Sequence, residues 1–171
     1  MKKITVLTRL ALLTALSLIL FVVELALPAA LPVPGAKLGL ANVVTVWAVY
    51  FCTPLQALLV LTARILLSAL ITGRAASLFF SFCGGLFALA GGLLLKKVVP
   101  PARLWLTSAL CGVLHNCGQL AAAAFAASTP ALFSYLPFLV VSGLVCGALT
   151  GQIALQTQDR LERGFFSRKD F

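Results

Sequence analysis

Long apolar runs, separated by short stretches rich in proline or polar residues, make up most of the chain. The runs are continuous rather than alternating, which favours helices over half-buried strands. Backbone groups in a bilayer must be satisfied within the protein, and a single helix needs about 20 apolar residues to cross it. The pattern therefore predicts an all-α integral membrane protein.

The breaks between the runs predict a bundle of six transmembrane helices. Pro28 ends the first run, and Pro54 suits the first turn of the third helix. The six helices are expected over residues about 5–27, 38–51, 54–71, 78–95, 104–127 and 133–155. Residues 1–155 would then form one membrane domain, and 156–171 a charged cytoplasmic tail.

Composition agrees with lipid as the main solvent. Hydrophobic residues make up 61% of the chain, charged residues only 10%, and the mean hydropathy is +1.09, whereas soluble domains carry roughly 25% charged residues. The cysteines form no CxxC pair, so we expect packing residues rather than a disulfide framework or a metal site. They are Cys52, Cys83, Cys111, Cys117 and Cys146.

The net charge of +9 lies at the ends of the apolar runs. A nucleic-acid surface would gather basic residues with aromatics on one face, so we expect no nucleic-acid partner. If both termini are cytoplasmic, the inner segments hold Lys2, Lys3, Arg9, Lys96, Lys97, Arg103, Arg160, Arg163, Arg168 and Lys169, and the outer ones Lys37 and Arg74. This positive-inside bias predicts a multi-pass protein of the cell membrane with both termini in the cytoplasm.

Several polar residues fall at membrane depth, where polar groups are costly and often functional. By position along their helices they converge on the outer half of the bundle: Glu24, Lys37, Asn42, Arg64, His115, Asn116 and Gln119. They predict an outward-facing pocket for a small polar or anionic solute. Two structural alternatives stay open: Glu24 could pair with Arg64 or Lys37 to lock the bundle, and Asn116 and Gln119 could form interhelical hydrogen bonds.

Catalysis by this chain alone is not expected. Magnesium-dependent diphosphate chemistry needs hard oxygen ligands, and the two aspartates, Asp159 and Asp170, lie in the tail. His115 is the single histidine, so a bis-histidine haem site cannot form. We therefore predict no catalytic residue, no cofactor and no metal site.

Small residues at four-residue spacing predict close helix packing. Gly84, Ala88 and Gly92 form one such set, and Gly143, Gly147 and Gly151 another; we expect both to pack inside the bundle.

Four motifs together resemble one family over nearly the whole chain: "KLGLANVVTVWAVYF", "ARILLSALITG", "SLFFSFCGGL" and "GVLHNCGQLAAA". They look like the Gx transporter family, also labelled heptaprenyl diphosphate synthase component I. That family is similar to the S-components of energy-coupling-factor (ECF) vitamin transporters. The resemblance implies six helices, an outward pocket under the loop after the first helix, and a coupling membrane subunit that docks with two ATPases.

The resemblance also assigns roles to particular residues. Ala11 and Ala15 match the spacing of an AxxxA motif that contacts the coupling subunit in many S-components, and the loop ending in Lys37 would be a lid. The leading hypothesis is a non-catalytic, solute-binding subunit of an uptake transporter. The alternative is a membrane accessory component of prenyl-diphosphate or quinone metabolism, whose pocket should open to the cytoplasm.

The orientation can be tested by cysteine labelling in intact cells. A cysteine introduced into "STPALFSY" (residues 128–135) should react with a membrane-impermeant reagent, whereas one in "KKVVPPAR" (residues 96–103) should not. The reverse pattern would contradict both the orientation and the transporter hypothesis.

Overall fold

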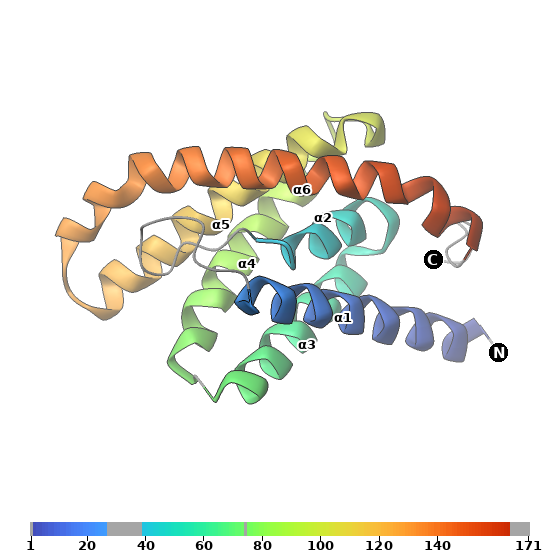
Figure 1. Cartoon of the computed structure of the whole chain (residues 1–171), viewed down its shortest axis with the longest axis horizontal. Coiled ribbons are helices and arrows are strands. Elements are labelled where there is room, and N and C mark those ends of the chain that lie inside the picture. The colour runs from blue at the N-terminus through green and yellow to red at the C-terminus, as the bar shows by residue number, and fades with distance from the viewer. Residues whose placement is uncertain (1, 27–38, 74, 165–171) are drawn as a thin grey trace.

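The computed structural model describes residues 2–26, 39–73 and 75–164, and these form helices joined by short connections (Figure 1). Within these ranges there is no strand, as the continuous apolar runs predicted. The elements are α1 (Lys2–Ala26), α2 (Asn42–Phe51), α3 (Pro54–Thr72), α4 (Ala75–Leu95), the 3-10 turn η1 (Pro101–Arg103), α5 (Leu104–Ala126), the 3-10 turn η2 (Pro130–Tyr135) and α6 (Leu136–Gly164).

Five of these helices are long and apolar enough to cross a membrane: α1, α3, α4, α5 and α6. The second helix is the exception, because α2 has only ten residues and therefore extends about 15 Å, half of the roughly 30 Å hydrocarbon core. It begins at Asn42 rather than near Leu38. Of the six predicted spanning helices, five thus have the length and composition to span, and α2 does not span by its own length.

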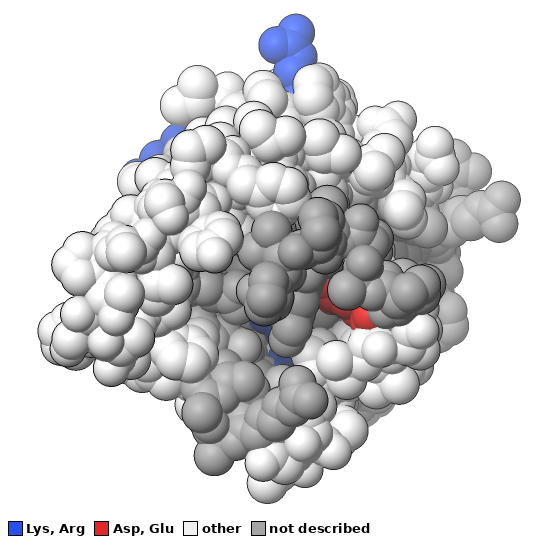
Figure 2. Space-filling view, turned by 60° about the vertical axis from the view of Figure 1, so that its left-hand side comes forward, with Lys and Arg blue, Asp and Glu red and all other residues white. Residues whose placement is uncertain are grey.

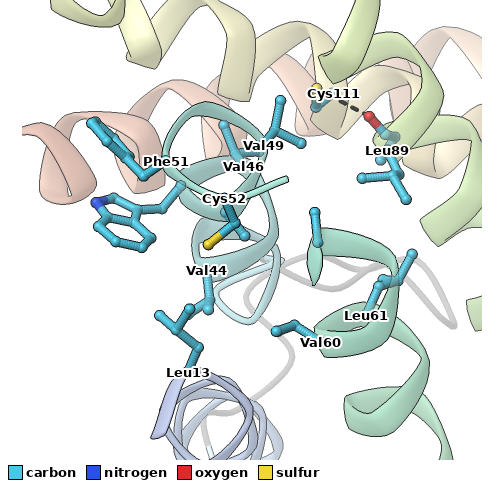
Figure 3. Packing of buried hydrophobic residues seen from close by; sticks show 14 of the residues in the cluster. Leu13, Val44, Val46, Val49, Phe51, Cys52, Val60, Leu61, Leu89 and Cys111 are labelled. Carbon is cyan, nitrogen blue, oxygen red and sulfur yellow. Dashed lines mark hydrogen bonds between the residues drawn. The ribbon is translucent and has the colours of Figure 1, made fainter. Parts of the chain in front are cut away.

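The short helix α2 lies in the core of the bundle. Seven of its ten residues are buried, and Figure 3 shows Val44, Val46 and Val49 surrounded by side chains from neighbouring helices, including Leu13 of α1 and Leu61 of α3. A helix that is apolar on all sides is one that the rest of the protein encloses. This burial fixes α2 as the element around which the long helices are arranged.

The turn between α2 and α3 forms as its sequence predicted. Pro54 occupies the first turn of α3, where its missing N–H costs nothing. The Thr53 hydroxyl accepts from the Gln56 N–H at 3.3 Å, and the Gln56 side chain accepts from the Thr53 N–H at 2.9 Å. This capping box satisfies two backbone donors at the start of α3, directly after α2 ends at Phe51.

The C-terminal end of α2 is tied to the connection between α4 and α5, which we call the basic end of the bundle (residues 96–103). The Lys96 ammonium donates to the Val49 carbonyl at 2.9 Å. The Tyr50 hydroxyl donates to the Val99 carbonyl at 3.1 Å and shares a 2.6 Å hydrogen bond with the Thr107 hydroxyl. These bonds place the last turn of α2 at the same level as the start of α5.

The first turn of α1 and the last turns of α6 lie on the same side of the molecule in Figure 1. α6 continues as a helix to Gly164, so it passes the predicted boundary at 155, and the first part of the expected tail is helical. Because both ends lie on one side, the chain must reverse direction at α2 as well as at the five long helices.

Close approach of α5 and α6 depends on glycines. A Cβ on Gly143 would lie 2.9 Å from the backbone of Gly112, and one on Gly147 would lie 2.5 Å from the carbonyl oxygen of Ser108. On α4, a Cβ on Gly92 would lie 3.2 Å from the Cys111 sulfur. The expectation that both glycine-containing sets pack inside the bundle is therefore confirmed.

Gly147→Ala should destabilise the protein by roughly 1–3 kcal/mol, because its new methyl group would meet rigid backbone of α5. Gly91→Ala is the matched control, since its Cβ would meet the terminal methyl group of Leu114, which can rotate away. Thermal unfolding in detergent measures the difference. Equal melting temperatures for the two variants would contradict the tight α5–α6 contact.

Candidate functional site

One cavity collects nearly all the polar residues that the sequence placed in the outer half. Six of the seven predicted site residues line it: Glu24, Asn42, Arg64, His115, Asn116 and Gln119. The seventh, Lys37, lies outside the described residues. All six helices contribute to the lining, with Ser81 from α4 and Thr150 from α6. The cavity has a volume of about 50 Å³, enough for about three to five water-sized groups.

The cavity exists because α2 begins deep in the bundle. The segment just before α2 is held to α1 by two hydrogen bonds: the Gly39 N–H donates to the Glu24 carboxylate at 2.6 Å, and the Ser17 hydroxyl donates to the Ala41 carbonyl at 3.1 Å. Gly39 has a φ of +75°, a conformation that glycine adopts without strain. The turn is therefore held against α1, and side chains of the longer helices line the cavity next to Asn42.

Arg64 is the cation of this site. It is 7% exposed and comes from the middle of α3. Its Nη2 donates to the Asn42 side-chain oxygen at 3.4 Å, a long hydrogen bond. Its Nε is buried and has no hydrogen-bond partner among the described residues. A buried donor left unsatisfied costs about 1–3 kcal/mol, so the guanidinium has capacity for a further acceptor.

Glu24 lines the same cavity from α1 and interacts electrostatically with Arg64. Its carboxylate also holds Gly39, so the residue has a clear structural task. The structure thus supports part of the alternative reading, in which Glu24 fixes the bundle, and it keeps Glu24 in the site as well.

The α5 residues divide into two groups. The Asn116 side chain donates to the Leu139 carbonyl of α6 at 2.8 Å and approaches the Ser142 hydroxyl at 3.5 Å, so it forms the interhelical hydrogen bond that the alternative reading proposed. His115 and Gln119 instead face α4, where a Cβ on Gly84 would lie 2.7 Å from the His115 carbonyl oxygen and 2.6 Å from the Gln119 side chain.

Sequence reasoning missed the small polar residues of the lining. Ser68, Ser81, Ser108, Cys146 and Thr150 all line the cavity, and the Ser108 and Thr150 hydroxyls lie 3.5 Å apart. The spacing on α5 could have revealed part of this set, because Ser108, Gly112, His115 and Gln119 follow one helical face. A serine or a cysteine in an apolar helix carries too weak a polarity to be distinguished from packing by sequence alone.

The two alanines assigned to partner contact lie on the outside of α1. Ala11 and Ala15 are exposed, whereas Leu13 and Ser17 on the other face of the helix are buried. Neither alanine lines the cavity. Contact with a coupling subunit stays a prediction.

No group of three or more potential metal ligands occurs in the described ranges, and all five cysteines are free thiols. Buried Cys111 donates to the Ala88 carbonyl at 3.4 Å (Figure 3), in the packing role that was expected of these residues.

Comparison with known proteins identifies a family. The family model described as heptaprenyl diphosphate synthase component I matches residues 13–157. No curated protein and no solved structure matched the chain.

Proposed function

The chain belongs to the heptaprenyl diphosphate synthase component I family, and from this premise and the cavity we propose that it is the solute-binding membrane subunit of an uptake transporter, similar to an S-component of ECF transporters. The proposal rests on one observation: six polar residues from four helices meet in a single cavity. In this role the protein binds a small polar or anionic solute and catalyses no reaction itself.

The position of the cavity supports access from the outer face. The basic end of the bundle is closed by the bonds that Lys96 and Tyr50 make around the end of α2, and the cavity lies beyond the opposite end of that helix, at Gly39 and Asn42. If the basic end faces the cytoplasm, as the positive-inside rule requires, solute reaches the cavity from outside.

The second candidate function follows from the family's description: a membrane accessory component of prenyl-diphosphate or quinone metabolism. A buried arginine would suit a diphosphate. The cavity of about 50 Å³ can hold only the polar head of such a molecule, so this candidate needs the prenyl chain to lie in lipid. If the ligand entered the cavity from the basic end of the bundle, this candidate would be favoured over the transporter subunit.

Arg64→Ala should weaken solute binding by roughly tenfold to a hundredfold, since a charge-assisted hydrogen bond contributes about 1.5–3 kcal/mol. The solute is first identified by mass spectrometry of small molecules that co-purify with the wild-type protein. Calorimetry then compares the wild type with Arg64→Ala and Arg64→Lys; the lysine keeps the charge but loses the planar fork. Normal binding combined with a lower melting temperature would make Arg64 a structural partner of Glu24.

Ala15→Trp should abolish uptake while leaving solute binding and folding intact. The reason is that Ala15 is exposed on α1 and does not line the cavity. A bulky side chain at this position would block a coupling subunit without reaching the solute. Uptake assays in cells, with solute binding of the purified variant as control, measure this. Unfolding of the variant would show that the alanine serves packing within the bundle.

A further inference from the structure

The cavity contains one residue of each charge. Of the described residues that line it, Arg64 and Glu24 are the two that carry a charge, and they interact electrostatically. Figure 2 shows acidic and basic atoms together in a hollow of the surface. An anion entering this space is attracted by Arg64 and repelled by Glu24, so net charge alone gives little affinity.

Glu24 cannot easily leave the site. Its carboxylate accepts a hydrogen bond from the Gly39 N–H at 2.6 Å. Gly39 lies in the turn that precedes α2, and this bond holds the turn against α1. A rotation of Glu24 away from the cavity would leave that partly buried backbone donor without its partner, which is costly away from water. The negative charge is therefore a fixed part of the recognition surface.

The Arg64 guanidinium has an unsatisfied hydrogen-bond donor in the same cavity as that carboxylate. The Nε of Arg64 is a buried donor without a hydrogen-bond partner among the described residues, and its bond to Asn42 is long. Around it, Ser68, Gln119 and other neutral side chains can both donate and accept hydrogen bonds. Such a lining distinguishes hydrogen-bond patterns rather than net charge.

We propose that the solute is electrically neutral at this point of the cavity and presents a carbonyl acceptor to Arg64 beside an N–H donor to Glu24, as an amide or ureide group does. This inference rests on the proposed function and names its ligand class. An amide places acceptor and donor on neighbouring atoms, and it loses far less hydration on entry than a carboxylate or an ammonium group. A cavity of about 50 Å³ suits a group of this size.

The test uses three small probes of similar shape: acetamide, acetate and methylammonium. Ligand-observed NMR of the purified full chain in detergent should show acetamide binding best to the wild type. Glu24→Gln should shift the preference toward acetate by about tenfold or more, and Arg64→Gln should shift it toward methylammonium by a similar factor. Lys97→Gln, which removes an exposed charge at the basic end, is the matched control and should keep the wild-type preference.

Two results would overturn the inference in different ways. If the wild type binds acetate at least as well as acetamide, the site takes an anion; if Glu24→Gln leaves the preference unchanged, Glu24 does not take part in recognition. In both cases the proposed function stands without this ligand class. If no probe binds the wild type, the cavity is not a binding site and the proposed function fails with it. Should Arg64→Gln not fold, as judged by gel filtration, the wild type and Glu24→Gln still decide between these outcomes.

Discussion

The backbone of the segment before α2 must be satisfied inside the bundle, and the rest of the site depends on how this is done. A ten-residue helix reaches only about half-way through a bilayer. Its C-terminal end is held at the basic end of the bundle, so its N-terminal end stops at depth. There the Glu24 carboxylate of α1 accepts a hydrogen bond from the Gly39 N–H, and the Ser17 hydroxyl of α1 donates one to the Ala41 carbonyl.

This arrangement makes the cavity and also restricts its chemistry. The same Glu24 that satisfies Gly39 places a negative charge in the cavity, and Arg64 supplies the opposing charge from α3. Asn42 accepts from Arg64 because it is the first residue of the short helix. A structural requirement of the backbone thus brings together the charged and polar groups of the cavity.

The packing of α5 against α6 forms another wall of the cavity. Glycines at the crossing let the two backbones approach closely, and this approach carries Thr150 to within 3.5 Å of Ser108. Asn116 adds a bond to the Leu139 carbonyl. These contacts hold α5 and α6 together where Ser108, Asn116 and Thr150 line the cavity.

The sequence by itself predicted an all-helical membrane protein, because long continuous apolar runs with few charges permit little else in lipid. It also located the start of α3 from Pro54, and it identified six of the cavity residues, since a polar side chain in an apolar run marks its own depth. Depth along a helix can be counted from the rise per residue.

Only the tertiary structure decided which way each helix faces and where α2 begins. Apolar residues lie on all sides of these helices, so their pattern does not fix rotation about the helix axis. For that reason the sequence could not distinguish Asn116, which bonds to α6, from Gln119, which faces α4. The start of α2 at Asn42 depends on two hydrogen bonds: the Ser17 hydroxyl donates to the Ala41 carbonyl, and the Gly39 N–H donates to the Glu24 carboxylate. These residues are distant in the chain and come together only when α1 packs beside α2.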